Sequence, residues 1–291
     1  MNSLRIPLVL AALLAGPSLP TLAQVYTPPD ADEHPHPHPH PAPLRGPEVT
    51  PNPAAQLPLA TISHTLYTSK SELYAESKPL IAGRPIRFTA HLTTLGASFR
   101  PYLAGQVTAR LQVGGQTLTA SVAKPEAPGI FRLQLPPAPA GTGMLVIDIV
   151  TPEFTDQFTI PGVVVYTDEA AARQLPRDER PGDISYIKEK SWLLPDFATQ
   201  PLGRGTVTKG ATNLTNVLVL PLTAFVNIGG RPHVYVQRTG ERFELRPVQT
   251  GPGDGRQVQL LSGVQEGERV IIGGAREILG ATVPAEHGHS H

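Results

Sequence analysis

The strongest constraint on the fold is a series of short runs in which apolar and polar residues alternate, separated by glycine and proline. From Ile86 to Leu92 every second residue is apolar, which is the period of a strand with one buried face. The run from Val107 to Val113 alternates in the same way, and Gly114-Gly115 follows it. Two glycines tolerate the positive φ angles of a tight hairpin. These runs predict an all-β fold, and because no heptad pattern is sustained, no long coiled coil is expected.

The alternating runs fall into two groups. The first predicts an immunoglobulin-like β-sandwich over residues 65–167, with strands near 86–92, 107–113, 118–122, 131–135, 145–149 and 163–165. The second predicts a membrane-proximal-type β domain over residues 184–281, with strands near 217–220, 223–226, 233–236, 243–248, 257–261 and 269–272. Between them, residues 168–183 are charged and contain two prolines, so we expect a linker in which Asp168 caps one short helix.

The two ends differ from this pattern. Residues 1–23 are typical of a signal peptide, with Arg5 before a short apolar run and small residues up to a cleavage position near Ala23. Residues 24–64 are rich in proline and histidine and predict a disordered segment. Residues 282–291 form a His-rich tail. We therefore expect export to the periplasm and association with the inner membrane only through partners, because no later run is long and apolar enough to span a bilayer.

Composition excludes several classes of function. The chain has no cysteine, so thiolate catalysis and thiolate metal ligation are excluded. Its formal net charge is zero and its basic residues are scattered, which argues against nucleic acid as a partner.

No catalytic constellation is evident, so the sequence predicts a protein that is not an enzyme. The glycine-rich stretch from Gly251 to Gly255 joins two expected strands and is interpreted as a hairpin loop. The adjacent Ser63 and His64 lie at the end of the linker, which is poor geometry for a nucleophile and its base. An enzyme on an unrecognised β scaffold remains as an alternative.

The histidines suggest metal binding. Seven of them alternate with proline, glycine or serine near the two ends of the chain: His34, His36, His38, His40, His287, His289 and His291. Neutral imidazole is a common ligand for Zn, Ni, Co, Cd or Cu(II), so these residues are the predicted metal ligands, although no cofactor is required. The alternative is a solvated low-complexity segment. His91, on the polar side of its strand, and His233 are expected to be ordinary surface residues.

Several segments resemble one family. The segments Lys188–Trp192 and Asp196–Thr199 resemble the Lys-Glu-x-x-Trp…Asp-Phe-Ala-Thr stretch of CzcB-like periplasmic adaptors, the membrane fusion proteins of resistance-nodulation-division heavy-metal efflux systems. Residues from Val219 to Gly274 are similar to their C-terminal membrane-proximal domain. Three further segments look like the extra N-terminal β domain of metal-specific members: Glu72-Leu73-Tyr74, Ala90–Thr93 and Pro128–Phe131.

This resemblance implies an adaptor-type or accessory subunit of a divalent heavy-metal cation efflux system. Its implied partners are the inner-membrane efflux pump, a full-length adaptor or both, and the resemblance leaves open whether the chain forms a homo-oligomer. The family's helical hairpin and most of its lipoyl-like domain are missing between Thr199 and Pro221, and residues 201–216 are expected to form at most a couple of helical turns. No direct contact with the outer-membrane channel is therefore expected. The alternative is a free-standing periplasmic metal-binding or buffering protein without a pump partner.

Overall fold

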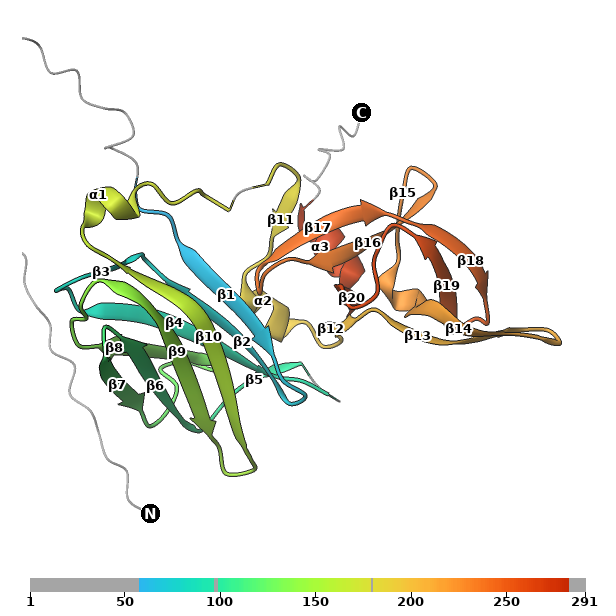
Figure 1. The fold of residues 1–291 in the computed structure, drawn as a ribbon. Coiled ribbons are helices and arrows are strands. Elements are labelled where there is room, and N and C mark those ends of the chain that lie inside the picture. The colour runs from blue at the N-terminus through green and yellow to red at the C-terminus, as the bar shows by residue number, and fades with distance from the viewer. Residues whose placement is uncertain (1–57, 97–98, 179, 283–291) are drawn as a thin grey trace, which may run out of the picture. The chain divides into compact units, whose positions relative to one another are not determined.

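The computed structural model describes residues 58–96, 99–178 and 180–282. The expected signal peptide and the seven histidines near the ends lie outside these residues. Within them the all-β prediction is confirmed, because strands dominate and helices are few and short (Figure 1).

Two sheets pack face to face in the first β domain. One has the order β1-β2-β4-β5 with β8 paired to β4, and the other has the order β3-β10-β9-β6-β7. The strands are β1 Ile62–Tyr67, β2 Ser71–Ser77, β3 Leu80–Ile81, β4 Ile86–Thr94, β5 Arg100–Pro101, β6 Gln106–Val113, β7 Gln116–Val122, β8 Ile130–Leu135, β9 Gly141–Val150 and β10 Thr155–Tyr166. Strand β1 begins at Ile62, before the domain start expected at residue 65.

The alternating residues form the core of this sandwich. Phe88, Leu92 and Ala109 are buried between the two sheets with the apolar side chains of β8, β9 and β10. The hairpin between β6 and β7 turns at Gly114 and Gly115, whose φ angles are 57° and 73°. The strand period and the turn chemistry therefore predicted this part of the fold correctly.

Three short elements follow the sandwich: α1 Glu169–Ala172, β11 Asp183–Ser185 and α2 Lys188–Leu193. The Oδ1 atom of Asp168 accepts a hydrogen bond of 2.9 Å from the backbone N–H of Ala171. This is the expected helix cap at the start of α1. Helix α2 occupies the Lys-Glu-x-x-Trp segment.

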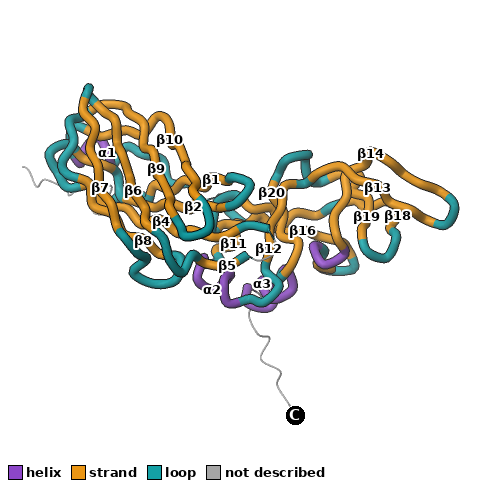
Figure 2. The backbone as a smooth tube through the Cα atoms, turned by 90° about the horizontal axis from the view of Figure 1, so that it is seen from below, coloured by secondary structure: helices purple, strands orange, loops and turns teal. Residues whose placement is uncertain are grey.

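The second β domain also has two sheets, of order β11-β17-β16-β20-β12, with β15 paired to β16, and β13-β14-β19-β18 (Figure 1 and Figure 2). Its elements are β12 Ala198–Pro201, β13 Gly203–Lys209, β14 Thr212–Pro221, the 3-10 turn η2 Leu222–Ala224, β15 Val226–Ile228, β16 Arg231–Gln237, β17 Arg242–Pro247, β18 Gln249–Gly253, β19 Gln257–Ser262, β20 Arg269–Gly273 and helix α3 Ala275–Thr282. Leu202, Leu220 and Val234 are buried in its core.

Residues 201–216 contain no helical turn, which is within the expected limit, and they form most of the hairpin β13–β14, which turns at Gly210 with φ 63° and buries Val207. Two other local predictions in this domain require correction. The strand expected at 223–226 is the turn η2 followed by β15. The expected 251–255 loop is shorter, because β18 extends to Gly253 and Asp254 accepts backbone hydrogen bonds from Arg256 and Gln257.

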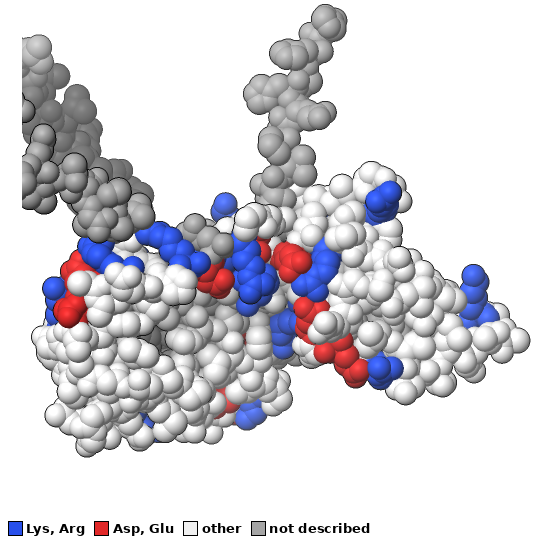
Figure 3. Space-filling model, turned by 45° about the horizontal axis from the view of Figure 1, so that its top comes forward, with Lys and Arg blue, Asp and Glu red and all other residues white. Residues whose placement is uncertain are grey.

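Charges are mixed on the face shown in Figure 3, where basic and acidic side chains are interspersed. This mixture on the visible face agrees with the scattered charges in the sequence. Among the described residues, no helix has the length and apolar character needed to cross a membrane.

Candidate metal site beside helix α2

Helix α2 is anchored to the sandwich by its tryptophan. The indole Nε1–H of Trp192 donates a hydrogen bond of 2.9 Å to Oγ1 of Thr93 on β4, and both residues are buried. Gly129 lies directly against the indole, so that a Cβ at this position would overlap the ring. The φ angle of Gly129 is +76°, which also favours glycine. Two of the segments that carry the family resemblance therefore meet at Trp192.

A buried ion pair lies at the first residue of the same helix. The Nζ atom of Lys188 lies 2.5 Å from Oε1 of Glu72 on β2, and both side chains are buried. Gln237 of β16 donates a hydrogen bond of 3.2 Å to the same carboxylate oxygen. The ammonium group also lies over the ring of Phe99, 4.9 Å from its centroid. These contacts join the sandwich, α2 and the second β domain.

The turn between β16 and β17, residues 238–241, lies against the same region. The backbone N–H of Gly240 donates a hydrogen bond of 2.8 Å to Oγ1 of Thr65, and Gly240 packs on the ring of Tyr74 with no room for a side chain. Thr239 accepts hydrogen bonds from the backbone N–H groups of Glu241 and Arg242, which fixes the turn. As a result Oε1 of Glu241 accepts a hydrogen bond of 2.7 Å from the backbone N–H of Lys188.

The prediction that His91 is a surface residue is wrong, because only 6% of it is exposed. It pairs with Tyr74 in the register of β2 and β4, and its ring lies 5.4 Å from that of Tyr74 and 6.3 Å from that of Trp192, measured between ring centroids. The polar face of β4 is covered here by α2, so the strand is buried on both faces.

Three carboxylates surround the His91 imidazole. Its Nδ1 atom lies 3.7 Å from Oε1 of Glu189, and its Nε2 atom lies 3.7 Å from Oε2 of Glu76. Glu76 is oriented by Tyr74, whose hydroxyl donates a hydrogen bond of 2.7 Å to Oε1. One potential ligand atom each from His91, Glu189 and Glu241 lies within 4.8 Å of the other two. We call His91, Glu189 and Glu241 the α2 triad.

Burial of the site favours a neutral imidazole at His91. Burial lowers the pKa of His91, although the charges of Glu189 and Glu76 oppose this shift. Burial also raises the pKa of Glu241, partly offset by the hydrogen bond from Lys188, and the charges of Glu76 and Glu189 raise it further. The ammonium of Lys188 is engaged by Glu72. A neutral imidazole beside carboxylates is suited to bind a divalent cation.

Of the other described histidines, neither His64 nor His233 belongs to the α2 triad. His34, His36, His38, His40, His287, His289 and His291 lie outside the described residues. His233 stands in β16 with Nδ1 3.0 Å from the backbone oxygen of Arg231. The resemblance to CzcB-like adaptors is the signal that could have located the triad. The segments that carry this resemblance, around Glu72, His91, Gly129 and Trp192, all converge beside α2.

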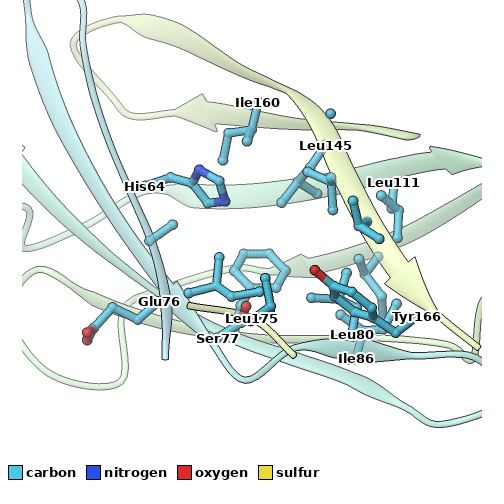
Figure 4. A pocket seen from close by; sticks show the side chains of 17 residues that line it. His64, Glu76, Ser77, Leu80, Ile86, Leu111, Leu145, Ile160, Tyr166 and Leu175 are labelled. Carbon is cyan, nitrogen blue, oxygen red and sulfur yellow. The ribbon is translucent and has the colours of Figure 1, made fainter. Parts of the chain in front are cut away.

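A second candidate is an apolar cavity of about 200 Å³ between the two sheets of the sandwich. In Figure 4 His64 extends from β1 toward Leu145 and Ile160, among mainly apolar lining residues. Burial lowers the pKa of His64. Ser63 and His64 lie in strand β1 and not, as expected, at the end of a linker. No nucleophile–base contact between these two side chains is observed among the described residues.

Comparison with known proteins bears on the second β domain. Residues 218–275 match the family model of the CzcB C-terminal circularly permuted SH3-like domain. The matched segment runs from within β14 through η2 and β15–β20 to the start of α3. No curated protein matches the chain, and no solved structure matches it. In this segment the chain therefore resembles the membrane fusion proteins of the CzcB type.

Proposed function

We propose that this chain is a periplasmic adaptor-type or accessory subunit of a divalent heavy-metal cation efflux system. The observation that carries the proposal is the similarity of residues 218–275 to the CzcB C-terminal domain. Adaptors of this family work beside a transporter, so the partners would be an inner-membrane efflux pump, a full-length adaptor, or both. The role requires no catalytic residue.

The same proposal includes export and metal collection at the ends of the chain. The segment before Ala23 would be removed during export, and the histidines near both ends would bind Zn, Ni, Co, Cd or Cu(II) without a preformed cage. Flexible ligands must be ordered when they bind, so their affinity would be modest. Mass spectrometry of the periplasmic protein should show a new N-terminus near Gln24, and an intact Met1 would contradict export with cleavage.

Contact with the outer-membrane channel is not part of this proposal. Within the described ranges the longest helix is α3, with 8 residues, and residues 203–221 form the hairpin β13–β14. Such short helices cannot make the long helical hairpin that the family uses to reach the channel. We therefore place the chain on the pump side.

In-cell photo-cross-linking tests the proposed partners. A photoreactive residue would replace the exposed Leu222 or Leu261, which are 47% and 56% exposed in the SH3-like region. The matched control is Leu103, 75% exposed in the sandwich. Capture of an inner-membrane transporter or adaptor from positions 222 and 261 is expected. Capture of the outer-membrane channel alone would contradict the proposal.

The alternative of a free-standing periplasmic metal buffer is favoured by the histidines at the two ends. That function needs no transporter. If positions 222, 261 and 103 all capture no membrane protein, while the chain still binds metal, the buffering function replaces the adaptor function.

A further inference from the structure

We propose that the α2 triad is a divalent cation site, built from His91 of the sandwich, Glu189 of α2 and Glu241 of the β16–β17 turn. Its choice of cation among the heavy metals rests on the proposed function, but binding itself does not. None of its three ligands is one of the seven histidines near the ends of the chain.

The imidazole of His91 has an unsatisfied ring nitrogen. The side chain of His91 is only 8% exposed, and its buried Nδ1 atom has no hydrogen-bond partner in the part of the chain that the structure describes. A buried polar atom without a partner is costly, and native structures usually satisfy it with protein, water or an ion. This atom is directed at the carboxylate of Glu189, yet at 3.7 Å the two are too far apart for a hydrogen bond.

The spacing of the three ligand atoms is close to that around a zinc ion. Zn²⁺ holds nitrogen and oxygen ligands at about 2.0–2.2 Å in a tetrahedron, so neighbouring ligand atoms lie about 3.4 Å apart. The three atoms of the triad lie within 4.8 Å of one another. Side-chain adjustments of about an ångström would bring them to a shared ion, and Glu189, with a side chain 42% exposed, is free to make such a movement.

Glu76 lies on the other side of the imidazole, next to Nε2. Histidines that bind a metal through one ring nitrogen usually donate the other N–H to a carboxylate, which fixes the tautomer. With Nδ1 toward the triad, Nε2 faces Oε2 of Glu76 at 3.7 Å. The Tyr74 hydroxyl holds that carboxylate from the other oxygen. The 3.7 Å separation is too long for a hydrogen bond, but a shift of about an ångström would let Nε2–H donate to Oε2, so we assign Glu76 as a positioning residue and not a ligand.

Negative charge is concentrated around the imidazole of His91. Glu76, Glu189 and Glu241 stand around one buried imidazole, while the ammonium of Lys188 is paired with Glu72. A bound dication would relieve the repulsion among these carboxylates. One imidazole and two carboxylates form a hard-to-borderline donor set, which favours Zn²⁺ and Co²⁺ over the soft Cu(I) and Ag(I). Three protein ligands leave one position open, so bound metal can exchange.

The triad also has a structural consequence. Its three ligands come from the sandwich, from α2 and from the turn of the second β domain. Metal binding would therefore stabilise the packing of these three parts against one another. The chain would bind its cargo ion and tighten this packing in one step.

The test uses the full chain with its seven end histidines replaced by alanine: His34, His36, His38, His40, His287, His289 and His291. We call this the end-substituted chain. Titration with Co²⁺, followed by visible absorption and calorimetry, should give one ion per chain with a spectrum of low coordination number. The Glu189→Gln change should weaken binding by at least about tenfold, and Glu76→Gln should weaken it by about 10–100-fold with the spectrum retained.

The matched control is Glu153→Gln, an exposed glutamate of the sandwich outside the site, which should leave the affinity unchanged. Circular dichroism of each variant excludes unfolding as the cause. No binding by the end-substituted chain, or equal affinity in Glu189→Gln and Glu153→Gln, would overturn the site. A chain that binds Co²⁺ here but cross-links to no inner-membrane partner would retain the site and lose the adaptor function.

Discussion

The ammonium of Lys188 lies 2.5 Å from the carboxylate of Glu72, and both side chains are almost completely buried. The two residues are far apart in sequence and belong to two segments that resemble the same family. Gln237 adds a third contact from β16. The Lys-Glu-x-x-Trp segment thus acts structurally by joining the sandwich to the second β domain.

Breaking this pair is expected to destabilise the chain strongly. Lys188→Met leaves Glu72 charged and buried, which should lower the free energy of unfolding by about 3–5 kcal/mol. Urea unfolding followed by circular dichroism measures the change. The double variant Lys188→Met with Glu72→Leu should be more stable than Lys188→Met alone, since no unpaired charge remains. If both variants were equally destabilised, lost packing and not charge would explain the effect.

We expect that position 129 requires glycine for two reasons: the positive φ angle, and the indole of Trp192, which leaves no room for a Cβ. Gly129→Ala adds a methyl group that overlaps the indole, and overpacking should cost about 1–3 kcal/mol beyond the backbone strain. Gly83→Ala is the matched control, because Gly83 has a similar φ of 73° but open space around its Cα. Equal losses of stability in the two variants would contradict the packing explanation.

The sequence predicted the β elements where local rules are sufficient. The run from Ile86 to Leu92 and the hairpin at Gly114-Gly115 follow from strand period and turn chemistry. His91 could not be placed in the same way, because its face of β4 is buried by α2, which lies far along the chain. Alternation shows which residues share a face but not what covers the second face. Of the β13–β14 hairpin only the strand at residues 217–220 is predicted, because the glycines and scattered apolar residues before it predict no element by themselves.

His64 is expected to make stability depend on pH. Its folded pKa lies below the unfolded value of about 6.5, so between these values the unfolded chain binds more protons and stability rises with pH. The free energy of unfolding should therefore fall as pH drops below about 6.5. His64→Gln should make this fall smaller. The check is a set of urea midpoints from about pH 7.5 to about pH 5; an unchanged slope in the variant would count against this contribution.

Metal at the α2 triad is expected to stabilise the folded chain. With free Zn²⁺ at about 100 times its dissociation constant, the end-substituted chain should gain about 2.7 kcal/mol by mass action. Glu189→Gln should gain less at the same concentration, and a chelator should reverse the gain. Thermal or urea unfolding with and without Zn²⁺ measures it. A gain of the same size in Glu189→Gln would place the stabilising ion elsewhere.

Above all, we propose that this chain serves the export of divalent heavy-metal cations. The most direct measurement is the rate at which cells loaded with radioactive zinc release it, compared between cells with and without the gene. The account predicts slower release without the gene, restored by the wild-type chain and restored less by Glu189→Gln. Unchanged release together with a rise in free periplasmic zinc would contradict it and identify a buffering protein instead.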